Sequence, residues 1–262
     1  MTFLMPTAAI DPIHQFQVSK WLDLNIGGVD LSFTNASGFM LLGVVATIAF
    51  FGVAASKGLL VPSRLQSMAE IGYGFVADMV RGAAGEEGLK FFPFVFTLFF
   101  FIFFANMIGM VPYAFTTTSH IIVTGALALL VITVVIGYGF MKHGMHFLGL
   151  FAPSLGDMHI LGKIGLYAIL IPIEVVSFVA RPLTLSLRLF ANMLAGHIML
   201  KLFAAFAVIG LTAGGIGYVV GPLAFSMGVA LNALEFLVAG LQAYVFAILT
   251  CVYLNDALHP GH

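Results

Sequence analysis

The sequence predicts an all-α integral membrane protein with about five transmembrane helices. Of its 262 residues, 61% are hydrophobic and only 8% are charged, and the mean hydropathy is +1.11. Soluble domains contain about 25% charged residues, so this composition is typical of a chain embedded in lipid. The net charge of −1 provides no basic surface of the kind that nucleic acid needs. We therefore expect no nucleic-acid partner.

Five apolar stretches are long enough to cross a hydrocarbon core of about 30 Å. They cover residues 37–55, 91–111, 119–140, 164–209 and 218–254. The last two are longer than a perpendicular span requires, so we expect these helices to be strongly tilted or partly outside the hydrocarbon. The Gly-rich segment between them, LTAGGIGYVVGP, is typical of a turn and predicts a long hairpin.

Charged residues in the remaining segments predict the topology. Residues 62–90 mix charged and apolar side chains, which indicates an interfacial amphipathic helix. We expect residues 1–36 to be an N-terminal segment outside the membrane, and residues 1–262 together to form a single membrane domain. The basic residues of the loops fall in 56–90 and 141–163, at Lys57, Arg64, Arg81, Lys90, Lys142 and Lys163. By the positive-inside rule, the N-terminus lies outside and the C-terminus inside.

A stripe of polar residues runs along the 164–209 stretch. Its members recur at steps of three or four, which places them on one helical face: Glu174, Ser177, Arg181, Thr184, Arg188 and Asn192. At 1.5 Å per residue the stripe is about 27 Å long, close to a membrane thickness. Two interpretations of Arg181 stay open: a buried ion pair with Glu174, or a functional charge.

Arg188 is harder to explain by packing. No carboxylate lies within four positions of it on its own helix. A central arginine costs from about 3 to more than about 10 kcal/mol in a membrane, so it must face water or an external partner. We expect the missing counter-charge to belong to another polypeptide.

The long hairpin also contains titratable groups. His197 lies nine residues after Arg188, half a turn round the helix and about 13 Å along it. On the last stretch, Glu235 and Gln242 are seven residues apart and share a face, with Asn232 close by. Titratable groups inside a membrane usually mark proton or ion routes, so we expect such a route here.

Cofactor-dependent functions fit the sequence poorly. The histidines form no bis-His pair within the spans and no metal-ligand cluster, and there is no Walker A loop or GxGxxG motif before a helix. We therefore expect no cofactor. A secondary ion transporter remains an alternative, because it too uses buried charges. Such a transporter would be active alone in liposomes, whereas a subunit of a larger machine would not.

Four segments together resemble subunit a of rotary F-type ATP synthases, of the mitochondrial and related bacterial type. They are LTLSLRLFANMLAGH (183–197), NMIGMVPYAFTTTSH (106–120), IPIEVVSFVARP (171–182) and LEFLVAGLQAYVFAIL (234–249). The resemblance implies a stator subunit that is no enzyme on its own and holds two proton half-channels against a rotating c-ring. It also implies peripheral-stalk b-type subunits as partners, in a bacterial or mitochondrial inner membrane.

The resemblance assigns roles to residues of the stripe and of the last helix. Arg188 matches the family's essential arginine, which faces a carboxylate of the c-ring, and Asn192 matches its neighbour in the motif. Gln242 matches the glutamine that faces this arginine. Glu174 matches the acidic residue of the inner half-channel, and Arg181 occupies a basic position beside the proline.

The resemblance also indicates an outer half-channel. His197 and Glu235 match its histidine–glutamate pair, which is reversed in many bacterial members. Asn106 matches the inlet lining. Gly109 departs from the pattern, because some members have an aspartate at that position.

Overall fold

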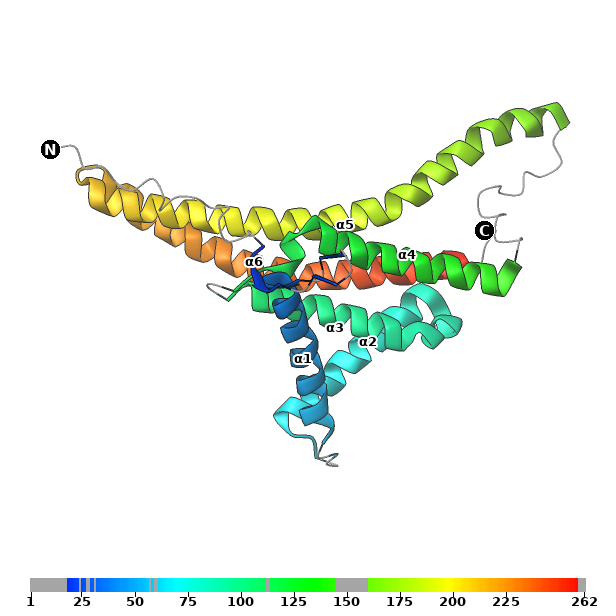
Figure 1. Cartoon of the computed structure of the whole chain (residues 1–262), viewed down its shortest axis with the longest axis horizontal. Helices are drawn as coiled ribbons and strands as arrows, with labels where there is room; N and C mark the ends of the chain where they lie inside the picture. The colour runs from blue at the N-terminus through cyan, green and yellow to red at the C-terminus, as the bar shows by residue number, and fades with distance from the viewer. Residues whose placement is uncertain are drawn as a thin grey trace. The chain divides into compact units, whose positions relative to one another are not determined.

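The computed structural model describes residues 18–23, 25–26, 29–30, 32–56, 58, 61–111, 114–144 and 160–258 (Figure 1). Within these residues, five helical segments are long and apolar enough to cross a membrane, which confirms the predicted all-α membrane fold. Residues 1–17 of the predicted N-terminal segment and residues 145–159 of the predicted basic loop lie outside the described residues, as does the side chain of Lys163.

The helices follow the predicted apolar stretches closely. They are α1 (Asn35–Ala55), α2 (Arg64–Gly88), α3 (Phe92–Gly109), α4 (Ile121–His143), α5 (Ile160–Ala213) and α6 (Gly217–Leu258), with 3₁₀ turns η3 (Leu89–Phe91) and η4 (Thr117–Ser119). The largest difference in length is in α5, which is longer at both ends than the predicted 164–209 and continues through Pro172 and Pro182.

Short strands precede α1 and were not predicted. β1 (Lys20–Leu22) pairs antiparallel with β4 (Phe33–Thr34), and β2 (Asn25–Ile26) pairs with β3 (Val29–Asp30). Asn35 joins this segment to the helix, because its Oδ1 accepts from the backbone N–H of Ser19 at 3.1 Å and from that of Ala36 at 2.9 Å. An asparagine at the start of a helix satisfies an N–H group that lacks a helical partner.

The predicted amphipathic helix is α2. Ser63 caps it, accepting from the backbone N–H of Gln66 at 3.3 Å. Val76, Val80 and Ala84 are buried on one face at intervals of four residues, as expected for an amphipathic helix.

The chain divides into two compact units, and the boundary passes through several helices. The first unit holds the described residues of 1–46, 102–120 and 190–242; the second holds those of 47–101, 121–189 and 243–262. The first therefore includes the parts of α5 and α6 on either side of their turn. The second includes α2, α4, the first part of α5 and the end of α6.

In the first unit, α5 and α6 form the predicted hairpin (Figure 1). Gly214 and Gly215 make the turn with φ of 69° and 57°, a left-handed conformation that glycine adopts without a Cβ penalty. The helices then pack closely: a Cβ on Gly217 would overlap the Gly210 carbonyl, and one on Gly221 would lie 3.0 Å from the Leu211 nitrogen. Side chains at these positions would force the hairpin apart.

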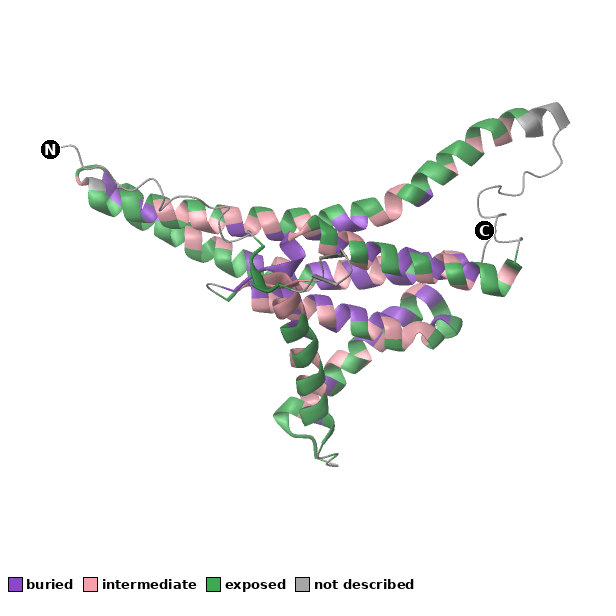
Figure 2. Cartoon of the chain, in the orientation of Figure 1, coloured by how far each residue is buried: buried purple, intermediate pink, exposed green. Residues whose placement is uncertain are grey.

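Burial differs strongly between the long helices (Figure 2). In the most apolar part of α6, 44% of the residues are buried, compared with 17% in α5 and 11% in α1. Of these three helices, α6 therefore has the largest buried share. Helices α1 and α5 keep large apolar side chains exposed, such as Leu183 at 58% and Ile48 at 67%, which suits contact with lipid or with other subunits.

Candidate functional site

His197 of α5 and Glu235 of α6 form a buried titratable pair in the first unit. The His197 Nδ1 lies 3.5 Å from the Glu235 Oε1, and each residue is only 6% exposed. Two side chains that can each bind and release a proton are thus placed side by side inside an apolar hairpin. Burying such groups is costly, and this pairing is typical of a proton route rather than of packing.

A polar segment between α3 and α4 covers the other side of the histidine ring. Residues 116–119, with the sequence TTTS, are all buried. The Thr116 Oγ1 lies 2.9 Å from the His197 Nε2 and 3.3 Å from the Gly109 carbonyl oxygen. A Cβ on Gly109 would lie 2.8 Å from the Thr116 Cγ2. Thr116 therefore fills the space that a side chain at position 109 would use.

Asn106, on α3, is fully buried and joins three segments of the first unit. Its Nδ2 donates to the Ala239 carbonyl on α6 at 3.0 Å, and its Oδ1 accepts from the Thr118 Oγ1 at 2.8 Å. Ala239 is one turn after Glu235. Asn106 thus holds both the threonine segment and α6 in the position that surrounds His197.

A second hydrogen bond links the two helices of the hairpin. The Asn192 Nδ2 donates to the Gln242 Oε1 at 2.9 Å. Gln242 is 1% exposed, whereas Asn192 is exposed at the surface of α5. A buried amide that accepts this bond is held in one orientation.

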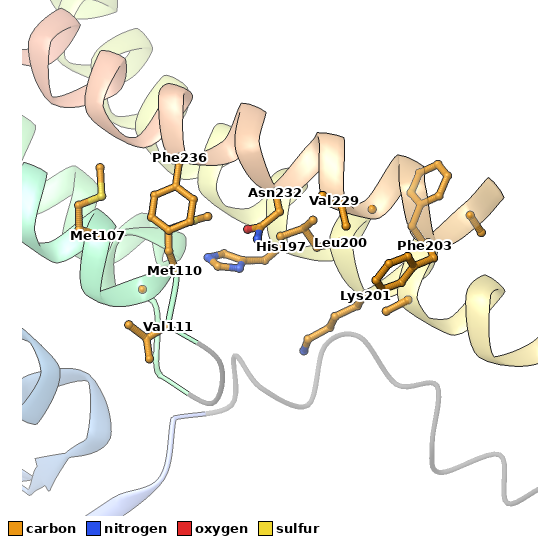
Figure 3. A pocket seen from close by; sticks show the side chains of 15 residues that line it. Met107, Met110, Val111, His197, Leu200, Lys201, Phe203, Val229, Asn232 and Phe236 are labelled. Atoms are coloured by element: carbon orange, nitrogen blue, oxygen red, sulfur yellow. The ribbon is translucent and has the colours of Figure 1, made fainter. Parts of the chain in front are cut away.

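A cavity of about 690 Å³ lies in the first unit, beside the histidine. His197 and Asn232 project into it from α5 and α6, and Lys201, one turn after His197, also lines it (Figure 3). Most of its remaining lining is apolar, including Phe203 and Phe236. A space of this size next to polar groups is large enough for several water molecules.

The second unit contains a cluster around Arg181. Its Nη1 donates to the Asp256 Oδ2 at 2.6 Å, whereas its Nη2 lies 4.0 Å from the Glu174 Oε1. Its guanidinium carbon also lies 5.3 Å from the centre of the Tyr253 ring. The predicted ion pair between Arg181 and Glu174 is therefore at the limit of contact, and Asp256 is the closer partner.

Arg188 is exposed on α5, in the second unit. Two nearby leucines, Leu185 and Leu189, are buried, with only 1% and 0% of their surface exposed, whereas Leu187 is 40% exposed. Arg188 therefore lies on the outward face of the helix. The ion pairs of the described residues in this unit, such as that of Arg181, do not include Arg188.

Metal ligands do not cluster in the described part of the chain, where no group of three or more His, Cys, Asp or Glu side chains could hold an ion.

Known proteins match this chain over nearly its whole length. The family model of the ATP synthase A chain matches residues 37–255. The chain belongs to the ATP synthase subunit a family. It is 74% identical to ATP synthase subunit a of Hyphomonas neptunium, with 97% of this chain and 98% of that protein covered. It is 56% identical to the subunit a of Mesorhizobium japonicum (98% and 100% covered) and 58% identical to that of Azorhizobium caulinodans (97% and 99% covered).

Membership of the subunit a family indicates the general function of this chain. The chain is an integral membrane protein and the proton-translocating subunit of the membrane sector of F-type ATP synthase. It acts in a complex with the other ATP synthase subunits. The resemblance that the sequence motifs indicated is thereby confirmed.

The subunit a structure groups the predicted site residues. Asn106, His197 and Glu235 share one network in the first unit, and Asn192 contacts Gln242 in the same unit. Glu174 and Arg181 lie together in the second. Arg188 and Gln242 belong to different units, and their expected contact stays a prediction.

Sequence reasoning missed three polar residues of these networks. Thr116 and Thr118 could have been suspected, because the TTTS run is unusually polar for the end of an apolar span. Asp256 gave no such signal. It is 75 residues from Arg181 in the sequence, and only the folding of α6 against α5 brings the two together.

Proposed function

We propose that this subunit a is the stator part of the proton motor. It forms two proton half-channels and holds Arg188 against a rotating c-ring, and so couples proton translocation to rotation and ATP synthesis. It is no enzyme on its own. The observation that carries the proposal is the buried His197–Glu235 pair within a hairpin whose α5 also exposes Arg188.

The outer half-channel is the cluster of the first unit. A proton that enters the cavity beside His197 is passed between the imidazole and Glu235, and then to a carboxylate of the c-ring. The 3.5 Å separation between Nδ1 and Oε1 supports this exchange, since such pairs tighten when the proton moves. The neutralised ring carboxyl group then faces lipid, where its ionised form would cost several kcal/mol.

Arg188 acts on the ring carboxylate when it returns. The guanidinium stabilises the ionised form and so favours release of the proton on the inner side. Its fixed positive charge also repels protons that would otherwise pass directly between the half-channels. The exposure of Arg188 on α5 supports a partner outside this chain.

The inner half-channel is the cluster of the second unit. Glu174 accepts the released proton. Arg181, whose closer partner is Asp256, contributes a positive charge beside it. Each charge that crosses a membrane under 100 mV supplies about 2.3 kcal/mol, which is the source of the work.

The assembly follows from the same assignment. We infer contact with the c-ring through α5 and with b-type subunits of the peripheral stalk, in a bacterial or mitochondrial inner membrane. The whole chain, residues 1–262, acts as a single membrane domain with its N-terminus outside and its C-terminus inside. Exposed Leu183 and Leu187 on α5 support a docking face beside Arg188.

The test replaces Arg188 in the assembled complex. Arg188→Ala is expected to abolish ATP-driven proton pumping in inverted membrane vesicles, and Arg188→Lys to restore little, because lysine lacks the planar fork that pairs with a carboxylate. Arg81→Ala is the control, since Arg81 is exposed on α2 and pairs with Asp78 and Glu86. Coupled pumping by Arg188→Ala at the wild-type rate would refute the proposal. A secondary transporter would instead move ions when this chain alone is placed in liposomes.

A further inference from the structure

Thr116 connects the end of α3 to the histidine of the proposed outer half-channel. We propose that Thr116 is a positioning residue that fixes the hydrogen on the Nε2 of His197, so that Nδ1 is the nitrogen that exchanges a proton with Glu235. This inference rests on the proposed function of His197 and Glu235. It goes further by naming the imidazole nitrogen that exchanges the proton and the residue that determines which nitrogen this is.

The first step is the hydrogen bonding of the Thr116 hydroxyl group. This group has one hydrogen to donate and lone pairs with which to accept. It lies 3.3 Å from the Gly109 carbonyl oxygen, which only accepts, and 2.9 Å from the His197 Nε2, which does either. Both contacts are satisfied when the hydroxyl group donates to Gly109 and the Nε2–H of His197 donates to the hydroxyl oxygen.

The alternative arrangement is less favourable. If Thr116 donated to Nε2, the buried Gly109 carbonyl would lose this donor. That carbonyl is at the last residue of α3, where helical carbonyl groups lack their usual partners. Leaving a buried acceptor unsatisfied is costly, so the Nε2–H form of His197 is favoured.

Thr116 is itself held in place by its neighbours. The Ser119 Oγ donates to the Thr116 carbonyl at 2.6 Å, and Thr118 is bonded to Asn106 at 2.8 Å. On the side of α3, the Thr116 Cγ2 packs against Gly109, where an added Cβ would lie 2.8 Å away. The hydroxyl group therefore has little freedom to turn away from the imidazole.

This hydrogen bonding determines which nitrogen of His197 exchanges a proton with Glu235. Neutral His197 with its hydrogen on Nε2 has its lone pair on Nδ1, which faces the Glu235 Oε1 at 3.5 Å. A second proton therefore binds at Nδ1. When it moves to the carboxylate, the N–H bond at Nδ1 breaks, an O–H bond forms on Glu235, and neutral imidazole and carboxylic acid remain.

Two charged groups face His197 within the described residues. Glu235 approaches it from α6, and Lys201 lines the same cavity from one turn further along α5. The threonine segment contributes hydroxyl groups only. Glu235 faces Nδ1 at 3.5 Å, whereas the Thr116 hydroxyl group faces Nε2 at 2.9 Å, so Thr116 is a group that distinguishes the two nitrogens.

The experiment compares Thr116→Val, which keeps the shape but removes the hydroxyl group, with Thr116→Ser, which keeps it. Thr133→Val is the matched control, because the Thr133 hydroxyl is exposed and donates only to the Leu129 carbonyl of its own helix at 2.7 Å. Each variant is studied in the assembled ATP synthase. One readout is the pH profile of ATP-driven proton pumping. The other is the ¹⁵N resonance of the His197 ring, assigned by its loss in His197→Gln.

We expect the wild-type complex to show a protonated Nε2 and an unprotonated Nδ1 in neutral His197. Thr116→Val should lose this preference and lower pumping on the order of tenfold, since acid–base groups depend on their orientation. Its pH profile should shift to lower pH by at least about half a unit, because the imidazolium loses a hydrogen-bond acceptor. Thr116→Ser and Thr133→Val should resemble the wild type.

An unprotonated Nε2 with a protonated Nδ1 in the wild-type complex would overturn the inference, even if Thr116→Val failed to assemble. So would a wild-type pH profile in Thr116→Val. The proposed function is tested separately by His197→Gln. If that variant loses pumping while Thr116→Val retains it, only the inference about Thr116 is wrong; if His197→Gln pumps normally, the proposed half-channel is wrong.

Discussion

Gly196 of α5 provides the space that the Glu235 carboxyl group of α6 occupies. A Cβ at position 196 would lie 2.7 Å from the Glu235 Oε1 and 2.9 Å from its Cδ. These distances are shorter than ordinary van der Waals contact. The absence of a side chain at Gly196 is therefore what allows Glu235 to reach the neighbouring residue on α5, His197.

We predict that Gly196→Ala strongly lowers proton pumping and also lowers the stability of the protein. The added methyl group displaces the carboxyl group from the imidazole, and the buried side chain has few other positions to adopt. We expect pumping in inverted vesicles to fall on the order of tenfold or more, with a cost in stability of about 1 to 3 kcal/mol. Gly125→Ala is the control, because a Cβ there meets only the Ser186 Oγ at 3.7 Å. Equal pumping by the two variants would contradict the prediction.

A second prediction concerns exchange of the buried pair. His197→Glu and Glu235→His should each impair pumping severely, because each leaves two like groups at the site. The double variant restores one imidazole and one carboxyl group in reversed order, and should recover part of the activity. It should not recover all of it, since an imidazole at position 235 no longer has the contact with Thr116. A double-mutant cycle measures the coupling, and strictly additive losses would show that the two residues act independently.

A third prediction concerns the partner of Arg181. Asp256→Asn should weaken a charge-assisted hydrogen bond of 2.6 Å. Because Arg181 and Asp256 are 21% and 33% exposed, water screens the pair and the loss of stability should be about 1 kcal/mol. Glu174→Gln should cost less stability, because its contact with Arg181 is 4.0 Å long. The thermal release of the subunit from the purified complex measures both, and a larger effect of Glu174→Gln would be evidence against this ranking.

A fourth prediction concerns His120, which lies just before α4 and stacks on Phe115 with ring centroids 4.8 Å apart. Burial lowers the pKa of His120 from its ordinary value of 6.5, because desolvation disfavours the charged ring. The unfolded state therefore binds the proton more tightly, and stability should fall as the pH drops below about 6.5, levelling off below the lowered pKa.

His120→Phe keeps an aromatic ring on Phe115 and removes the titration. Thermal stability of the complex, measured between about pH 5 and pH 8, should therefore depend less on pH in this variant than in the wild type. Identical pH dependence in the two complexes would mean that His120 does not contribute.

Much of this fold could be predicted from the sequence, because a membrane imposes a simple rule on composition. A helix that satisfies its own backbone needs about 20 apolar residues to cross, so the stretches at 37–55 and 91–111 nearly coincide with α1 and α3. The strands before α1 could not be predicted in this way. They are only two or three residues long, too short for an alternating pattern to be recognised.

The candidate site was predictable where charge and periodicity marked it. Arg188, His197 and Glu235 are conspicuous because ionisable residues in an apolar span are costly and therefore rarely incidental. Thr116 and Gly196 are not conspicuous in this way, since a threonine and a glycine cost little at most positions. Their importance depends on what lies opposite them, a histidine nitrogen at 2.9 Å and a carboxyl group that needs the space.

The sequence alone therefore determined the membrane fold, the long hairpin and the titratable residues along it, because apolar length and buried charge are local properties of the chain. Only the tertiary structure decided which groups meet: Thr116 with His197, Asn106 with the Ala239 carbonyl, and Asp256 with Arg181. These pairs are separated by 75 to 133 residues. Their distances depend on helix crossing and on the turn between helices, and a helical period along one segment contains no information about either.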